Sequence, residues 1–382
     1  MNKTFKIPFA LAILAAALVG CSSNKVKEEK IKPSPLPKIV QATSLVPIFS
    51  QSVATTPEED PLRLRLDANN GVIFIVNPKG EVVAYKGKQR LWEVKVTQQG
   101  LSSGVEAADG LVVVGNKKGQ LFALDQATGA QQWTAQLSGA IISPALIQSG
   151  RVIVVANDGT VFAFDQTSGQ QAWTYKLPNA QFSLRGQAAP VSIDPRTIVV
   201  ATSNGYIYAI DSLTGVPRMQ QRVAVSEGRS DIQRLIDVDG DPVVAGQFLV
   251  TTSYQGQVTT TDLASQRVIW SEDASSITRP EVSDNKVFVA QVDGKLTAYD
   301  LTTGQQLWQN EQLLNRNLSN PVMFGKNLVV GDLDGYLHLI DPNTGNLIGR
   351  NKTSGEVRSL RVIDEQLYVS TRKGAVSVWQ NR

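Results

Sequence analysis

The chain has 382 residues, of which 42% are hydrophobic, and it carries 37 Lys and Arg against 34 Asp and Glu. This length and hydrophobic content allow a large buried core, and the near balance of charge, without a basic block, argues against nucleic acid as a partner. One histidine and one cysteine supply neither a nucleophile–histidine pair nor a cluster of metal ligands. The residues themselves therefore predict no catalytic site, no metal and no cofactor.

Residues 1–20 have the form of a secretory signal peptide. Lys3 and Lys6 precede the apolar run "IPFALAILAAALVG", which is too short to span a bilayer comfortably. The run ends at Cys21 in "LVGC", the form of a bacterial lipobox, in which the cysteine is acylated and becomes the new N-terminus. Because Cys21 is the only cysteine, it has no disulfide partner in the chain. We expect lipid on Cys21 to hold the protein at a membrane surface, the alternative being an ordinary signal peptide that ends at an incidental cysteine.

The residues after Cys21 predict a destination and a tether. Ser22 and Ser23 take the place of an aspartate, as in lipoproteins that are sent on to the outer membrane. The polar, proline-bearing run that follows indicates a flexible linker, so residues 21–40 are predicted to be the lipidated cysteine and its tether. Removal of the signal peptide takes away Lys3 and Lys6 and leaves a nearly neutral mature chain.

The remaining residues, 41–382, contain eight copies of one unit. Well-preserved examples are "GQLFALDQATGAQQW" from Gly119 and "GKLTAYDLTTGQQLW" from Gly294. The starting glycines are 39, 40, 46, 51, 38, 41 and 39 residues apart, and they are Gly80, Gly119, Gly159, Gly205, Gly256, Gly294, Gly335 and Gly374. A period near 40 with four short β-prone runs per unit predicts an all-β fold, an eight-bladed β-propeller of four-stranded antiparallel blades.

The last unit stops after its third strand, at Arg382. The segment "QATSLVPIFSQSV", Gln41 to Val53, is β-prone and has no other assignment. We expect this N-terminal segment to pair with the last blade, since that pairing closes the ring and removes an exposed edge.

Two side chains recur at fixed points of the unit. The aspartates precede a turn in which a carboxylate can accept backbone N–H bonds, and the tryptophans occupy one point of the outer strand. A ring places the copies at different azimuths, so we interpret both as structural. They are Asp125, Asp165, Asp211, Asp262, Asp300 and Asp341, and Trp92, Trp133, Trp173, Trp270 and Trp308. The single histidine, His338, lies in the strand run "YLHLID" and is expected to be a packed or rim side chain.

The stretch "RLIDVDGDPVV" has acidic residues at alternate positions, Asp237, Asp239 and Asp241, as a calcium loop does. An EF-hand loop needs glycine at its sixth position and glutamate at its twelfth, where this chain has Pro242 and Phe248. The pattern therefore does not support a calcium site.

The unit "LDxxTGxxxW" resembles the repeat of the quinoprotein dehydrogenases, eight-bladed propellers that carry pyrroloquinoline quinone. That resemblance implies the alternative function, a periplasmic dehydrogenase. It also implies adjacent cysteines, a central calcium ion and a catalytic aspartate, and this chain has no second cysteine.

The whole chain resembles the BamB family, the lipoprotein propellers of the β-barrel assembly machinery, in its lipobox, tether, eight repeats and truncated last blade. The resemblance implies a non-catalytic scaffold at the periplasmic face of the outer membrane, which binds the barrel-forming subunit BamA and aids the insertion of β-barrel proteins. Contact with unfolded outer-membrane protein clients stays open. The most specific motifs lie outside the repeat, in "FSLRGQAAPV" (Phe182 to Val191) and "RLIDVDGDPVV" (Arg234 to Val244).

These two motifs lie in the two consecutive long intervals, 46 and 51, between an outer strand and the next blade. Long loops on a rigid scaffold are frequent recognition sites. The resemblance implies that the partner-binding residues are Phe182 and Leu184 as apolar contacts, Arg185 as a forked donor, and Asp237 and Asp239 as acceptors. Alternatively, Arg185 is bonded internally to Asp237 or Asp239. Phe182 at an aliphatic position of the family motif and the added Asp241 depart from that motif.

Overall fold

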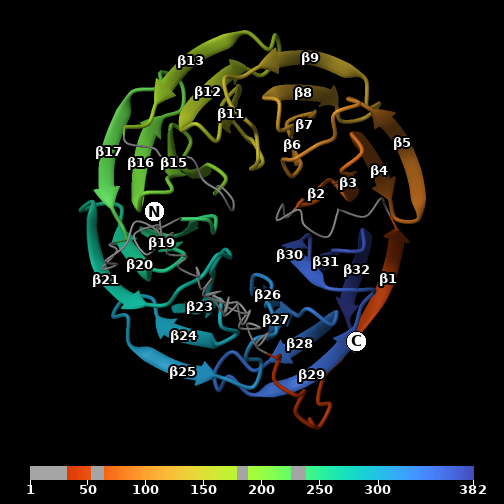
Figure 1. Ribbon diagram of the computed structural model, residues 1–382, viewed down its shortest axis with the longest axis vertical. Coiled ribbons are helices and arrows are strands. Elements are labelled where there is room, and N and C mark those ends of the chain that lie inside the picture. The colour runs from red at the N-terminus through yellow and green to blue at the C-terminus, as the bar shows by residue number, and fades with distance from the viewer. Residues whose placement is uncertain (1–31, 53–63, 179–187, 225–237) are drawn as a thin grey trace, which may run out of the picture. The chain divides into compact units, whose positions relative to one another are not determined.

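The structure, a computed structural model, describes residues 32–52, 64–178, 188–224 and 238–382. Pro33–Arg382 form one compact unit, which contains all of the described strands. Within that unit, eight four-stranded sheets follow one another around a ring (Figure 1). The parts of the chain that the structure describes contain no helix able to cross a membrane. The predicted all-β, eight-bladed propeller is confirmed.

Blades 1 to 4 are each built from four consecutive strands, of which the first lies nearest the axis of the ring (Figure 1). Blade 1 contains β2 (Asp67–Asn69), β3 (Val72–Val76), β4 (Glu81–Lys86) and β5 (Gln89–Lys95). Blade 2 contains β6 (Glu106–Ala108), β7 (Leu111–Gly115), β8 (Gln120–Asp125) and β9 (Gln131–Gln136). Blade 3 contains β10 (Leu146–Gln148), β11 (Arg151–Val155), β12 (Thr160–Asp165) and β13 (Gln171–Lys176). Blade 4 contains β14 (Val191–Asp194), β15 (Thr197–Ala201), β16 (Tyr206–Asp211) and β17 (Pro217–Arg222).

Blades 5 to 7 repeat this order, and blade 8 joins the two ends of the propeller. Blade 5 contains β18 (Val243–Ala245), β19 (Phe248–Thr252), β20 (Gln257–Asp262) and β21 (Arg267–Asp273). Blade 6 contains β22 (Glu281–Ser283), β23 (Lys286–Ala290), β24 (Leu296–Asp300) and β25 (Gln306–Asn310). Blade 7 contains β26 (Val322–Phe324), β27 (Asn327–Gly331), β28 (Tyr336–Ile340) and β29 (Leu347–Lys352). Blade 8 contains β30 (Val357–Ile363), β31 (Gln366–Thr371), β32 (Ala375–Asn381) and β1 (Leu45–Ser52).

The closing strand is where the sequence places it. β1 runs antiparallel to β32, with Leu45 opposite Asn381 and Ser52 opposite Ala375. Leu45 and Phe49 on β1 are 3% and 6% exposed, so the strand contributes apolar packing as well as backbone hydrogen bonds. The prediction that an N-terminal strand completes the last blade is confirmed.

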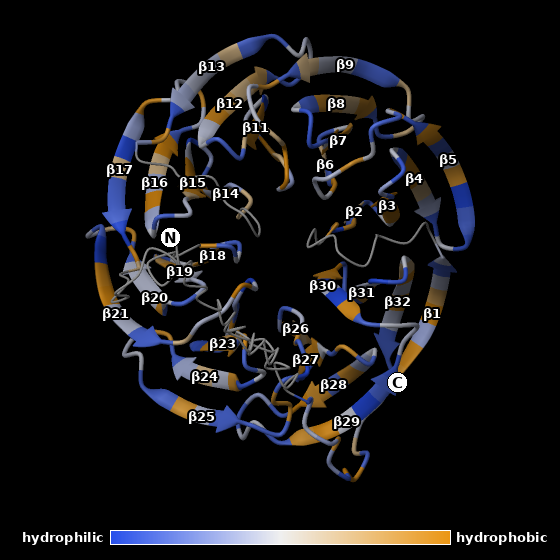
Figure 2. Ribbon diagram, viewed as in Figure 1, coloured by the Kyte–Doolittle hydropathy of each residue, from blue (hydrophilic) through white to orange (hydrophobic). Residues whose placement is uncertain are grey.

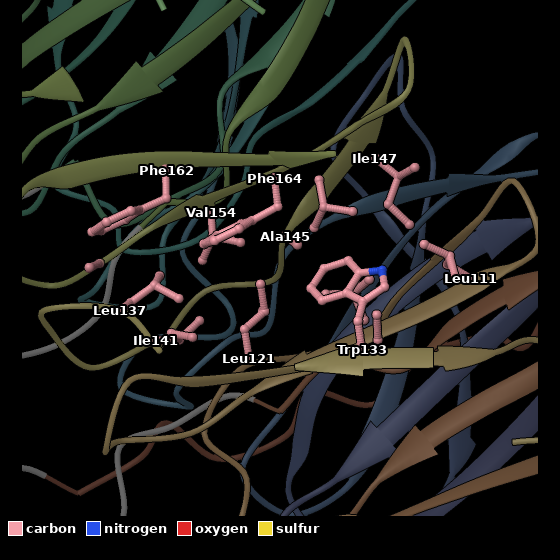
Figure 3. Close-up of a cluster of buried hydrophobic side chains, with 14 residues drawn as sticks. Leu111, Leu121, Trp133, Leu137, Ile141, Ala145, Ile147, Val154, Phe162 and Phe164 are labelled. Atoms are coloured by element: carbon pink, nitrogen blue, oxygen red, sulfur yellow. The ribbon is translucent and has the colours of Figure 1, made fainter. Parts of the chain in front are cut away.

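The middle strands of each blade are covered on both faces by the neighbouring blades. Every residue of β7 is buried, as are four of the five residues of β11. Figure 2 shows hydrophobic residues gathered in the strands, and Figure 3 shows how Trp133, Leu121 and Phe164 meet where blades 2 and 3 pack. This double burial explains why the strands have nearly continuous apolar sequences instead of alternating ones.

The repeated aspartates shape the turns between the third and fourth strands. In blade 2, Asp125 Oδ1 accepts hydrogen bonds from the backbone N–H groups of Ala127, at 3.1 Å, and Thr128, at 2.8 Å. The same bond to the N–H two residues downstream occurs at Asp125, Asp165, Asp211, Asp262, Asp300 and Asp341. The structural interpretation of these aspartates is confirmed.

The repeated tryptophans join each blade to the next. Trp92 Nε1 donates to the carbonyl oxygen of Gln126, which follows the repeat aspartate of blade 2. The turn glycine of blade 2, Gly129, must lack a side chain, because an added Cβ would lie 2.7 Å from the Trp92 ring. The equivalent Trp Nε1 bond to the next blade is made by Trp92, Trp133, Trp173, Trp270 and Trp308. Their expected role in packing between blades is confirmed.

The segment before β1 lies against blade 7, which the tether prediction did not anticipate. Arg316 Nη1 donates to the carbonyl oxygen of Ser34 at 2.8 Å, and Arg350 Nη2 donates to that of Pro37 at 3.3 Å. Gly349 stands where five other blades have tryptophan, and an added Cβ there would lie 2.4 Å from the Thr43 carbonyl oxygen. The compact unit that contains the propeller thus includes residues from Pro33 onward.

His338 is a packed side chain, as expected, with no exposed surface. Its Nε2 lies 3.0 Å from Asp332 Oδ2, and Arg350 Nε donates to its Nδ1 at 3.3 Å. Burial lowers the pKa of His338, and Asp332 only partly opposes this effect. The neutral imidazole thus links Asp332 to the arginine that contacts Pro37.

Candidate functional site

Connections from the outer strand of one blade to the inner strand of the next differ in length. The two long intervals of the sequence correspond to residues 177–190, from β13 to β14, and 223–242, from β17 to β18. The connection from β21 to β22, residues 274–280, is much shorter than either of these. The two long connections join blades 3, 4 and 5, so they occupy neighbouring junctions, as the sequence predicts.

The described ends of these connections converge on one core cluster. Ala188 lies near the end of the first connection, Val223 begins the second, and Val238 belongs to its described end; their exposed fractions are 0%, 4% and 1%. All three pack in the hydrophobic cluster that blades 4 and 5 share. The scaffold thus fixes the ends of both connections next to one another.

The junction between blades 4 and 5 departs from the repeat at two contacting positions. Met219 on β17 replaces the tryptophan, and it pairs with Ala209 as Trp133 pairs with Ala123. Gln266, with φ of 57°, replaces the turn glycine of the next blade. In other blades the tryptophan ring packs against the turn glycine of the next blade. Because the two residues contact each other, the absence of one accompanies the absence of the other. This paired absence marks the junction from which the longer connection leaves.

Five of the six residues proposed from the sequence as functional lie outside the described residues. They are Cys21, Phe182, Leu184, Arg185 and Asp237. The sixth, Asp239, is half-buried, and both of its carboxylate oxygens are shielded from solvent. A shielded carboxylate fits an internal contact better than a direct acceptor for a partner, and Arg185, its partner in the bracing alternative, lies outside the described residues.

Asp241 holds the ends of the two long connections together. Its Oδ1 accepts the backbone N–H of Ala189, at 2.8 Å, where the first connection ends. Its Oδ2 forms an ion pair with Arg65. Among the described residues, no group of three or more Cys, His, Asp or Glu is placed to hold a metal ion. The acidic pattern that resembles a calcium loop thus includes one carboxylate that is used within the fold.

Charged side chains gather near the start of the inner strands, a feature that the repeat pattern does not reveal. Arg361 Nη1 lies 2.8 Å from Asp67 Oδ1, and the Asp67 carboxylate also accepts the Ala107 N–H at 2.9 Å. Burial, together with repulsion from Arg361 and Arg279, lowers the pKa of Arg65 to about 9, which leaves it cationic at neutral pH. Burial first, and then Asp67, raises the pKa of Glu106 to about 7.

The raised pKa of Glu106 predicts a pH dependence of stability. Its ordinary value is 4.5, so between about pH 4.5 and 7 the folded protein binds more protons than the unfolded chain, and stability falls as pH rises through this window. Glu106→Gln removes this loss, so at pH 8 its free energy of unfolding is expected to exceed that of wild type by up to about 3 kcal/mol. Chemical denaturation at pH 5 and pH 8 measures this difference. Parallel pH profiles of the two proteins would contradict the prediction.

A third long connection, residues 53–66 from β1 to β2, was not recognised from the repeat spacing. It precedes the first repeat glycine, so no interval between glycines includes it. Its described end contains Arg65, the partner of Asp241. A signal in the sequence was available, since the closing-strand prediction placed an outer strand at Gln41–Val53 and left a long gap before the next apolar run.

Comparison with known proteins agrees with this architecture. The family model described as Outer membrane protein assembly factor BamB matches residues 78–310 and 292–381. BamB of Salmonella typhimurium is 33% identical over 373 residues, which cover 94% of this chain and 95% of that protein. BamB of Pseudomonas aeruginosa is 34% identical over 378 residues, which cover 98% of both chains.

Solved structures show the same relationship. The crystal structure of BamB from Moraxella catarrhalis has a TM-score of 0.83 at 32% identity and covers 88% of this chain and 100% of that chain. Quinohemoprotein alcohol dehydrogenase from Comamonas testosteroni has a TM-score of 0.69 at 14% identity, covering 88% of this chain and 76% of its own, and this likeness shows the fold alone. The chain therefore belongs to the family of the outer membrane protein assembly factor BamB.

Proposed function

We propose that the chain is a non-catalytic scaffold lipoprotein of the outer-membrane β-barrel assembly machinery, and that it binds the barrel-forming subunit BamA. Relatives that cover nearly all of this chain are named as outer membrane protein assembly factors. The observation that carries the proposal is the convergence of Ala188, Val223 and Val238 in one core cluster. It gives the two long connections a common rigid base, as a recognition surface needs.

The proposed surface combines apolar and charged contacts. Phe182 and Leu184 supply apolar area, and Arg185 supplies a forked donor for carboxylates or backbone oxygens of the partner. Asp237 is the proposed acceptor. Because the oxygens of Asp239 are shielded, we assign Asp239 to the support of this surface.

A scaffold role fits the chemistry of the chain. The only histidine is buried between Asp332 and Arg350, where it is not available as a base. The only cysteine, Cys21, stands in the lipobox. The repeat aspartates are engaged in turns around the ring. The histidine and the repeat aspartates thus have structural uses, and the cysteine has a proposed anchoring use.

Co-purification tests the proposal directly. The wild-type lipoprotein, isolated from detergent-solubilised outer membrane, is expected to retain BamA through washing, and the pure protein is expected to lack a quinone chromophore. A quinone absorption band with dehydrogenase turnover on added quinone and calcium would instead support the alternative enzyme. Absence of BamA from the purified material would contradict the scaffold.

We also propose that lipid on Cys21 anchors the protein to the periplasmic face of the outer membrane. The motif "LVGC" and the following serines support this proposal. Cys21→Ala is expected to abolish acyl labelling and to move the protein into the soluble periplasmic fraction, because it removes the thiol to which the anchoring lipid would be attached. Fractionation with a labelled fatty acid measures both effects. A membrane-bound Cys21→Ala protein without label would contradict lipid anchoring.

A further inference from the structure

The ion pair between Arg65 and Asp241 joins opposite sides of the ring. Arg65 precedes β2 of blade 1, and Asp241 precedes β18 of blade 5. With eight consecutive blades, blades 1 and 5 face each other, and Figure 2 shows β2 and β18 on opposite sides of the axis. The two side chains are only 25% and 11% exposed. This contact spans the centre of the propeller, unlike the tryptophan contacts, which join adjacent blades.

Hydrogen bonds from neighbouring blades fix the backbone at Arg65. Its carbonyl oxygen accepts the N–H of Val105 at 3.0 Å, which ties it to the start of blade 2. An added Cβ at Gly104 would lie 3.1 Å from that same oxygen, so this glycine permits the close approach. Arg361 Nη1 donates to the carbonyl of Leu66, the next residue, at 3.2 Å. The guanidinium therefore extends from a segment fixed by blades 2 and 8.

Asp241 links Arg65 to the ends of both long connections. It belongs to the last described residues of the second connection, and its other carboxylate oxygen accepts the Ala189 N–H at the end of the first. Gly240 beside it is closely packed, since an added Cβ would lie 2.4 Å from the Thr278 carbonyl oxygen. Movement of the Asp241 carboxylate would thus displace the ends of both connections together.

We propose that Arg65 is a positioning residue for partner binding, which acts through Asp241 to fix the ends of the two connections at Ala189 and Asp241. The identity of the partner in this inference rests on the proposed function. The role of Arg65 in holding the two connections is independent of that function, and proteolysis of the connections measures it. Removal of the arginine leaves the Asp241 carboxylate, which is only 11% exposed, without its ion-pair partner, and this favours its displacement from Ala189.

The first experiment measures the connections themselves. Limited trypsin digestion of the full mature lipoprotein in detergent reports cleavage after Arg185 and Arg234, which belong to the two connections. Arg65→Gln and Asp241→Asn are expected to raise both cleavage rates about tenfold. Arg151→Gln is the matched control, because Arg151 has the same 25% exposure and pairs with Asp165 at 3.4 Å, in blade 3. Cleavage rates equal to those of the control would overturn the proposal.

The second experiment measures affinity for purified BamA. Arg65→Gln and Asp241→Asn are each expected to bind roughly tenfold more weakly, equivalent to about 1.4 kcal/mol, and the double variant is expected to be no weaker than either single variant. Arg65→Lys keeps the cation and should bind nearly as wild type does. The inference would be contradicted if the losses of affinity in the two single variants added up in the double variant. It would also be contradicted if the variants kept both the affinity and the cleavage rates of wild type. Failure of wild type to bind BamA would contradict the proposed function alone, because the cleavage result stands without a partner.

Discussion

Removal of Gln41–Val53 is expected to abolish cooperative folding at 37 °C, or to lower the melting temperature by more than about 10 °C. The deletion removes β1, so β32 loses its partner along the whole strand and becomes an exposed edge. It also removes the buried side chains of Leu45 and Phe49. Loss of a buried leucine and a buried phenylalanine costs at least about 5 kcal/mol together, which is comparable with the total stability of many domains. Thermal melting and light scattering measure the loss of stability and the aggregation.

Two shorter deletions test whether the effect is specific to the closing strand. Residues 24–32 lie outside the propeller unit, so their removal is expected to leave the melting temperature unchanged. Removal of residues 33–38 is expected to have an intermediate effect, because Arg316, only 3% exposed, loses the Ser34 carbonyl that it contacts. Buried donors without acceptors cost roughly 1–3 kcal/mol each. A Gln41–Val53 deletion that melts as wild type does would show that the ring closes in another way.

Repetition in the sequence explains why the fold could be predicted. A glycine period near 40 implies the blade, and eight copies with an incomplete last one imply closure by an N-terminal strand. The paired loss at Met219 and Gln266 shows that each repeat position has a physical partner in the next blade. Such contacts recur, so a single sequence contains several examples of each.

Features that occur once were harder to predict. The segment around Ser34 and Pro37 is polar and rich in proline, as linkers are, yet it is held by Arg316 and Arg350 of blade 7. No repeat indicates these contacts, because five other blades carry tryptophan where blade 7 has Gly349. Composition predicts a tether for residues 21–40, and tertiary hydrogen bonds hold Ser34 and Pro37 within it.

The sequence predicted which junctions carry the two long connections, but not the contacts at their ends. Interval length identified the two neighbouring connections, and their ends do share one core cluster. Spacing does not identify the bond from Ala189 to Asp241 or the cross-ring partner Arg65. Those contacts depend on which inner-strand ends face each other across the axis, and that arrangement follows from ring closure, not from local sequence. Asp241, a departure from the family motif, is thereby given a structural role.

Asp239 changes how the proposed surface should be tested. Its carboxylate oxygens are shielded, so a charge reversal there is expected to disturb folding as well as binding. Leu184 and Arg185 belong to the connection and not to the repeat that builds the core. Substitution of these two residues therefore separates partner binding from stability better than substitution of Asp239 does.

Arg185→Glu is expected to reduce BamA affinity by at least about 30-fold while the melting temperature stays within about 2 °C of wild type. Reversal of one partner in a hydrogen-bonded charge pair at an interface costs roughly 2–5 kcal/mol, whereas surface substitutions usually change stability by less than about 0.5 kcal/mol. Leu184→Asp should act in the same direction, since it places a charge among apolar contacts. Pull-down and direct titration with BamA, beside a thermal melt of each variant, measure the two quantities separately.

Asp300→Ala provides the opposite pattern for comparison. Asp300 Oδ1 accepts the backbone N–H groups of Thr302, at 2.9 Å, and Thr303, at 2.8 Å, in a repeat turn of blade 6. Its loss is expected to lower stability by about 1–2 kcal/mol and to leave the affinity of the folded fraction for BamA unchanged, because blade 6 does not contribute either long connection. Retention of wild-type affinity by a well-folded Leu184→Asp, Arg185→Glu double variant would exclude this surface. BamA would then have to bind another face of the propeller, and the convergence of the two connections would need a different explanation.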